Sequence, residues 1–166
     1  MNRATAGPRR AVFFDLVRAS YTAPQQRLVE AAARAHRDMG DLLVAVGPAA
    51  LDGPTGADIV LDPDEWVSTV GRECDTRPGS PCTRSLAVVE AIARLGLDAA
   101  QCFGYGDPCD GGAVLSIVGN PRAIAFTPEA VQAARRRGWP IVTAPPLGTP
   151  AHDGPPLHGG HPSQYN

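Results

Sequence analysis

Short apolar runs alternate with amphipathic stretches along the first half of this chain. The runs at 11–14, 42–46 and 57–61 predict buried strands. Residues 24–38 carry apolar side chains at helical spacing after Pro24 and predict a helix between the first two strands. Strand, helix and strand in this order form the β-α-β pattern, which joins parallel strands. The pattern therefore predicts a parallel sheet.

The same alternation continues through the second half of the chain. We expect strands at 101–105, 122–126 and 140–143, and helices at 86–95, 113–118 and 128–138. Thr127 and Pro128 are typical of a helix start, and Gly138 of a helix end. About six strands alternating with about four helices predict an α/β fold with a doubly wound, mostly parallel sheet.

Pro and Gly mark the parts of the chain that carry little regular pattern. The stretch 63–81 predicts loop or strand fragments, and 1–150 is expected to form one domain. Residues 151–166 are rich in Pro, Gly and His and are expected to be a disordered tail. The connections after Asp15 and between Val46 and Ala57 are short, which leaves no room for a large cap domain.

Composition narrows the chemistry that the chain can perform. The 15 basic residues are all arginine, because the sequence contains no lysine. This excludes a Schiff-base lysine, a pyridoxal-phosphate anchor and the lysine of a phosphate-binding P-loop. The four cysteines form no CxxC pair and are expected to be thiols rather than disulfides or zinc ligands.

Charge and hydropathy bear on partners and location. The formal net charge is -2, which does not favour nucleic acid as a partner. No apolar run approaches the roughly 20 residues of a membrane span, and residues 1–10 do not resemble a signal peptide. We expect a cytoplasmic protein that binds neither nucleic acid nor membrane.

Two acidic residues follow predicted strands and form the first candidate site. Asp15 ends the first strand, and Asp107 follows the strand at 101–105, with Asp110 in the same turn. Ligands of doubly wound sheets bind outside the carboxyl ends of the strands, and Mg²⁺ prefers carboxylate oxygens. The residues therefore predict a magnesium site, unless the two acids merely cap helices or begin turns.

Several segments together resemble a known superfamily. They are VFFD at 12–15, CFGYGD at 102–107, AVLSIVGNP at 113–121, FTPE at 126–129 and RGWPIV at 137–142. Over about 10–142 the chain resembles the haloacid dehalogenase (HAD) superfamily, in particular its phosphoserine-phosphatase-like branch. The resemblance implies a HAD-like Rossmannoid α/β fold, a phosphoryl-transfer activity and a bound Mg²⁺.

The resemblance also implies roles for individual residues. Asp15 matches the aspartate that attacks phosphorus and binds the metal. Val17 stands where the phosphatases of this family have a second aspartate as general acid and base, so only its carbonyl oxygen could serve, as a metal ligand. The second strand ends without Ser or Thr, which leaves backbone donors such as that of Gly47 for the phosphate. Arg84 falls near the position of the family's lysine.

The last motif of the family is matched in part. Asp107 coincides with its first acid, whereas the second acid falls on Gly111, one residue after Asp110. The implied metal ligands are therefore Asp15, Val17, Asp107 and Asp110. General acid–base catalysis is worth about 10²–10⁴-fold, so the valine at position 17 predicts a poor phosphatase.

Two functions from different classes follow. The first is a HAD-like hydrolase, a weak Mg²⁺-dependent phosphatase with an aspartate nucleophile that acts on a phosphorylated small molecule. The second is a catalytically inactive HAD-like module that binds a ligand or a protein partner. A third and minor alternative is non-phosphate chemistry at Asp15, since the dehalogenases of the family also have no second aspartate.

Overall fold

The computed structural model describes residues 10–15, 22–47, 56–62, 81–109 and 112–142. In these residues six parallel strands form one sheet, in the order β3-β2-β1-β4-β5-β6. The strands are β1 (Ala11–Asp15), β2 (Leu42–Val46), β3 (Ile59–Leu61), β4 (Phe103–Gly106), β5 (Asn120–Ile124) and β6 (Ile141–Val142). This order reverses between β1 and β4, which confirms the doubly wound fold.

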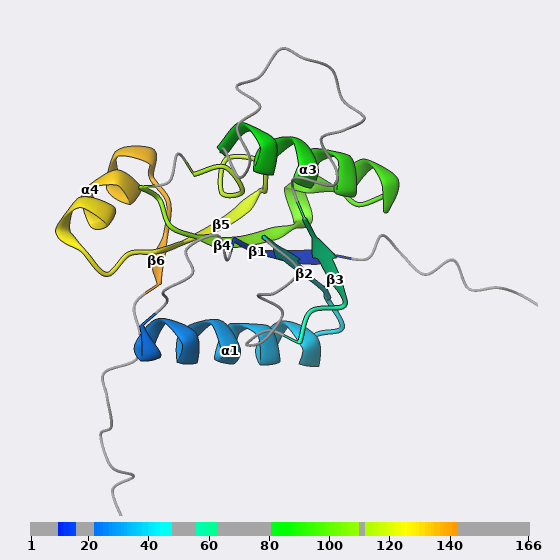
Figure 1. Cartoon of the computed structure of the whole chain (residues 1–166), viewed down its shortest axis with the longest axis horizontal. Coiled ribbons are helices and arrows are strands. Elements are labelled where there is room, and N and C mark those ends of the chain that lie inside the picture. The colour runs from blue at the N-terminus through cyan, green and yellow to red at the C-terminus, as the bar shows by residue number, and fades with distance from the viewer. Residues whose placement is uncertain (1–9, 16–21, 48–55, 63–80, 110–111, 143–166) are drawn as a thin grey trace, which may run out of the picture.

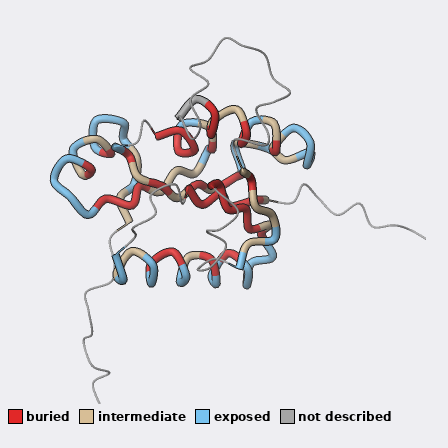
Figure 2. Tube along the Cα trace, viewed as in Figure 1, coloured by how far each residue is buried: buried red, intermediate tan, exposed pale blue. Residues whose placement is uncertain are grey.

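Helices cover both faces of the sheet (Figure 1). They are α1 (Ala23–Asp38), α3 (Pro81–Arg94) and α4 (Pro128–Arg137), with a 3₁₀ turn, η3 (Ala99–Gln101), before β4. Helix α1 lies on one face, and α3 lies on the other, on the same side as α4. This three-layer arrangement explains why β1 is buried along its whole length, since a central parallel strand is covered on both faces. Figure 2 shows the buried residues concentrated in the sheet and on the helix sides that face it.

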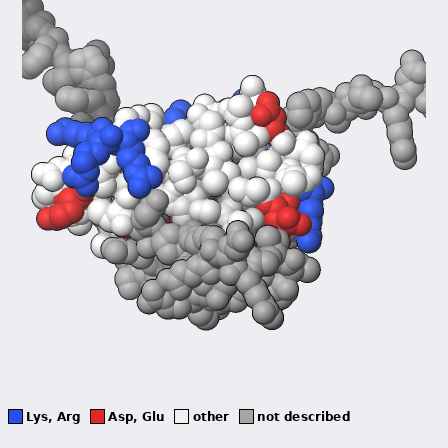
Figure 3. All heavy atoms as spheres, turned by 90° about the horizontal axis from the view of Figure 1, so that it is seen from above, with Lys and Arg blue, Asp and Glu red and all other residues white. Residues whose placement is uncertain are grey.

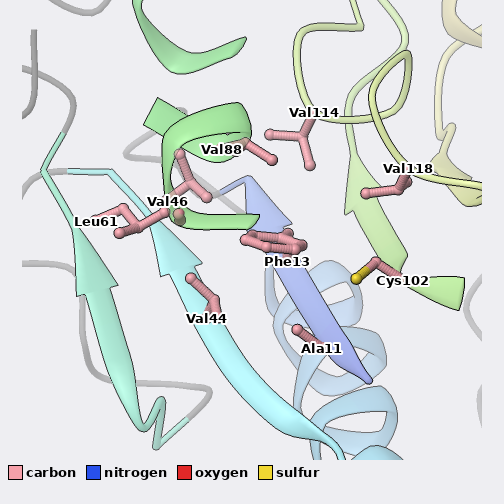
Figure 4. Packing of buried hydrophobic residues seen from close by; sticks show 10 residues of the cluster. Ala11, Phe13, Val44, Val46, Leu61, Val88, Cys102, Val114 and Val118 are labelled. Atoms are coloured by element: carbon pink, nitrogen blue, oxygen red, sulfur yellow. The ribbon is translucent and has the colours of Figure 1, made fainter. Parts of the chain in front are cut away.

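Successive residues of β1 point into two different cores. Phe13 packs on the α3 side with Val88 of that helix and Val114, as Figure 4 shows. Phe14 packs on the α1 side, in a cluster with Leu28 and other apolar side chains of the helix. The two phenylalanine rings are fully buried, and burying a side chain of this size contributes about 1.5–3 kcal/mol. Strand β1 is therefore held in register from both faces.

The predicted ends of α4 are confirmed in detail. Thr127 caps the helix, because its side-chain oxygen accepts a hydrogen bond of 3.2 Å from the N–H of Ala130. Pro128 occupies the first turn, and Gly138 ends the helix in the left-handed conformation.

Two helix predictions differ from the structure. Segment 113–118 forms turns instead of a helix. Most of its apolar side chains are buried. The N–H of Ile117 donates to the carbonyl of Val114, and that of Gly119 donates to the carbonyl of Ala99. These bonds turn the chain towards β5 after a single helical turn. Helix α3 begins at Pro81, five residues before the predicted start at 86, because its first turn is polar and carries no apolar period.

Smaller differences concern the strands, whose ends are set by pairing. Strand β3 is limited to Ile59–Leu61, and β5 begins at Asn120 instead of 122. The predictions for 63–80 and for the tail 151–166 lie outside the described residues. Within the described ranges no cap domain is present, and none of their helices is long and apolar enough to cross a membrane.

A buried polar network links α1, β2 and β4 at the amino-terminal edge of the sheet. Nδ1 of His36 lies 2.8 Å from Oδ2 of Asp41, and its Nε2 lies 3.1 Å from the hydroxyl of Tyr105. Since an ionised carboxylate only accepts, His36 donates to Asp41 through Nδ1. Arg10 donates from Nε to the other oxygen of Asp41 at 3.0 Å. The Asp41 carboxylate thus accepts hydrogen bonds from two side chains, those of Arg10 and His36.

Replacing Asp41 with alanine should destabilise the fold strongly. The Asp41 and His36 side chains are each only 3% exposed, so the substitution would leave His36 buried without its acceptor. Leaving a buried hydrogen-bonding group without its partner costs about 1–3 kcal/mol. Urea unfolding measures the change, and Asp38→Ala at an exposed position of α1 provides the control. If the two variants had equal free energies of unfolding, the network would contribute nothing to stability.

Alkaline pH should also lower the stability through Tyr105. Burial raises the pKa of Tyr105 above its ordinary value of 10.0, although nearby Arg122 lowers it. Its contribution to stability is therefore complete below about pH 10 and is lost as pH rises through the higher pKa of the folded state. Burial raises the pKa of the Cys102 thiol as well, which gives the same sign. Urea unfolding of the Tyr105→Phe chain between pH 9 and 11 should show a shallower decline than that of the native chain.

Candidate functional site

The candidate site lies at the carboxyl end of β1, where Asp15 meets an arginine of α3. Asp15 is the last residue of β1, and its side chain is 8% exposed. Arg84 lies in the first turn of α3 and is 1% exposed. Nε of Arg84 lies 3.4 Å from Oδ2 of Asp15. The structure therefore brings together two of the residues that the sequence singles out.

Because both side chains are buried, each needs the opposite charge of the other to offset its loss of hydration. Transfer of either ion from water to a protein interior costs several kcal/mol, which only an opposite charge and hydrogen bonds offset. Arginine keeps its charge in such a place, whereas a buried lysine readily loses its proton. The first turn of α3 adds the positive end of a helix dipole on the same side. Asp15 thus lies beside a permanent cation.

Residues next to Arg84 fix the start of α3. Ser85 donates from its hydroxyl to the carbonyl of Ala113 at 2.9 Å, which attaches the helix to the turns after β4. Thr83 is buried at the same turn. The sequence predictions did not include either residue, since the apolar period of the helix begins only after them. The polar sequence Thr-Arg-Ser at 83–85, directly before the apolar period, is the feature that could have indicated an earlier helix start and these two residues.

Strand β4 brings Asp107 to the neighbouring position. Phe14 pairs with Tyr105, so Asp15 lies beside Gly106 and Asp107 follows directly. The contact is close, because a Cβ on Gly106 would lie only 3.1 Å from the Cβ of Asp15. Any larger residue at 106 would push the Asp15 side chain. Asp107 is itself oriented by its turn, since its Oδ1 accepts from the N–H of Cys109 at 2.8 Å.

The backbone amide of Gly47, predicted as a phosphate donor, makes a hydrogen bond within the sheet. Its N–H donates to the carbonyl of Leu61 at 2.9 Å, which extends the pairing between β2 and β3. A substrate-binding role for this amide would require that bond to open. Val17 and Asp110, the other two predicted site residues, lie outside the described residues.

The side chains at this edge are of the chemical type that binds a hard cation such as Mg²⁺. Asp15 and Asp107 supply carboxylate oxygens from adjacent strand ends, at the point where the strand order of the sheet reverses. Within the described ranges, no group of three or more His, Cys, Asp or Glu side chains could hold a metal ion. Among the described residues, these two carboxylates are the ones that a Mg²⁺ at this edge would have as ligands, with water and substrate oxygens adding to its coordination.

Comparison with solved structures identifies the fold. A protein of unknown function from Bordetella pertussis Tohama I superposes with a TM-score of 0.55 at 16% identity, covering 82% of this chain and 99% of that one. A putative HAD family hydrolase from Streptomyces avermitilis has a TM-score of 0.50 at 18% identity, over 84% of this chain and 83% of that one. The fold is HAD-like.

Other comparisons add little to this conclusion. The cobalt-bound deoxy-D-mannose-octulosonate 8-phosphate phosphatase of Haemophilus influenzae has a TM-score of 0.45 at 14% identity, covering 76% of this chain and 74% of that one. No family model and no curated protein matches the sequence. The HAD-like fold accounts for the position of Asp15 at the end of the central strand, beside the neighbouring strand that leads to Asp107.

A double-mutant cycle should show that Asp15 and Arg84 stabilise the fold as a pair. Arg84→Met and Asp15→Asn should each lower the free energy of unfolding by about 3–5 kcal/mol, because each leaves an opposite charge buried. The double variant should lose much less than the sum, since it buries no charge. Urea unfolding provides all three values.

A matched arginine on the same helix serves as the control. Arg94 is 55% exposed and pairs with Glu90 at 2.7 Å, so Arg94→Met should cost no more than about 0.5 kcal/mol. Strict additivity in the double variant would contradict direct coupling between Asp15 and Arg84.

Proposed function

We propose that this protein is a HAD-like hydrolase that cleaves phosphate monoesters with Asp15 as its nucleophile. The observation that carries the proposal is the pairing of Asp15 with Arg84 at the carboxyl end of the central strand. This end of a doubly wound sheet is where its ligands bind. Arginine also binds phosphate with a planar, two-pronged set of donors.

The proposed reaction has two steps at Asp15. In the first, a carboxylate oxygen of Asp15 attacks phosphorus, the ester P–O bond breaks, and the leaving alkoxide takes a proton from water. In the second, water attacks the phosphorus of the aspartyl phosphate, which releases inorganic phosphate and restores the carboxylate, and the proton that this water loses neutralises the hydroxide left by the first step. Arg84 orients the attacking oxygen and stabilises negative charge on the phosphoryl oxygens.

The predicted metal would support the same steps. Bound by Asp15 and Asp107, Mg²⁺ would neutralise charge on the phosphoryl group as a Lewis acid. Valine at position 17 offers no proton to the leaving group, so the reaction should be slow for a phosphatase. A substrate with a good leaving group, which needs no proton, should be cleaved best. The proposed substrate is a phosphorylated small molecule.

A catalytically inactive HAD-like module is the second candidate. The burial of Asp15 favours it, because the carboxylate must reach phosphorus to react and only 8% of the side chain is exposed. The engagement of the Gly47 amide by Leu61 favours it too. In this case the protein would act by binding a ligand or a partner protein.

Phosphate release separates the two candidates. The native chain with Mg²⁺ should hydrolyse activated aryl phosphates, such as p-nitrophenyl phosphate, and Asp15→Asn should abolish turnover. The amide is close in size to the carboxylate but is a far weaker nucleophile. Turnover that persists in Asp15→Asn would rule out the nucleophile assignment. No turnover on any of a panel of phosphomonoesters would favour the inactive module.

Restoring the missing acid provides an independent check. Val17→Asp should raise the rate on alkyl phosphates by about 10²-fold or more, because these substrates need a proton on the leaving group. The gain on aryl phosphates should be smaller. A uniform gain on both substrate classes would contradict a general-acid role at position 17.

A further inference from the structure

A pocket lies between helix α4 and the turn at residues 107–109 that follows β4, here called the Asp107 turn. It has a volume of about 360 Å³, at the small end of the range for pockets that hold small molecules. Two segments form it, one from the turn after β4 and one from a single side of α4. Its lining residues are Pro108, Cys109, Glu129, Ala133, Arg136 and Arg137.

The pocket has an apolar floor and a charged rim. Pro108 is buried and Ala133 is half-buried, whereas Glu129, Arg136 and Arg137 are exposed. Within the described residues no ion pair joins either arginine to a carboxylate. The rim therefore has an excess of one positive charge, with its acid and its arginines at opposite ends of α4.

Figure 3 shows basic side chains gathered at the end of the molecule where α4 lies. Arg135, Arg136 and Arg137 form the last turn of that helix. Cations there interact favourably with the helix dipole, which explains their presence on α4 but not the pocket beside them. Only two of the three arginines line the pocket, and this difference can be tested.

One of the two lining arginines is held in place by an aromatic ring. The guanidinium of Arg137 lies 4.9 Å from the ring centroid of Trp139. The indole packs in turn against Gly112, where a Cβ would lie only 2.1 Å from the ring. Gly112 also has a φ of +60°, which a side chain rarely adopts. The turn after β4 and the arginine end of α4 are therefore fixed relative to each other.

We propose that this pocket binds a small molecule bearing an oxyanion, either a carboxylate or a phosphate, through Arg136 and Arg137. The two guanidinium groups match the oxygens of such a group. Glu129 at the other end accepts a hydrogen bond from a hydroxyl or ammonium group of the same molecule. The size of the pocket suits a metabolite with few heavy atoms and excludes a folded partner.

Among the described residues, Cys109 connects the pocket to the candidate site. Cys109 lines the pocket, and its N–H holds Oδ1 of Asp107. A ligand that shifts Cys109 therefore shifts Asp107. The pocket is distinct from the Asp15 and Arg84 pair, so the inference does not depend on whether that pair hydrolyses phosphate esters.

Titration with two probes tests the proposal. Pyrophosphate and succinate represent the phosphate and the carboxylate, and calorimetry measures the affinity of the native chain for each. Arg136→Gln and Arg137→Gln should each weaken binding of the preferred probe by about tenfold, as expected for a charged hydrogen bond. Arg135→Gln, which removes the same charge from the same helix turn outside the pocket, should change it less than about twofold.

Amide chemical shifts locate the bound probe. The largest changes should fall on Cys109 and Ala133, on the two sides of the pocket. Largest changes at Ser85 would place the anion beside Arg84 and overturn the proposal. An equal loss of affinity in Arg135→Gln would indicate general surface charge and overturn it too. So would an affinity weaker than about 10 mM for both probes in the native chain.

Discussion

A charged arginine inside a protein needs an opposite charge within a few ångströms, and at the carboxyl edge of this sheet Asp15 meets that need for Arg84. The pair attaches the first turn of α3 to the end of the central strand. With α3 held there, Val88 packs over Phe13 and closes the core on that face of the sheet. The same contact therefore joins the core on one face of the sheet to the candidate site.

The pair also sets the conditions for any chemistry at Asp15. A phosphoryl group would compete with the carboxylate for the guanidinium of Arg84, and it would have to enter a place where both side chains are almost wholly buried. Gly106 leaves room on the β4 side, because it has no side chain to press on Asp15. The proposed hydrolysis would thus start from a stable, buried ion pair, which predicts slow chemistry.

Local patterns in the sequence predict much of the fold. Strands β1 and β2 are continuous apolar runs, and α4 carries its cap, proline and terminal glycine in the sequence itself. The helix predicted at 113–118 is wrong because the next residue, Gly119, bonds to the distant Ala99 and ends the helical turn. The bond between His36 and Tyr105 spans 69 positions and leaves no local trace. The pocket beside Arg136 and Arg137 cannot be predicted from local sequence either, since it forms where α4 meets the turn after β4.

The location of the Asp15 and Arg84 pair has an evolutionary consequence. A single exchange at either position would bury an unbalanced charge, so most single changes would be eliminated by selection through loss of folded protein. Related sequences should therefore keep both residues or replace both together, and positions 15 and 84 should covary in an alignment. Arg94 and Glu90, a pair that is partly open to solvent, should by contrast drift independently.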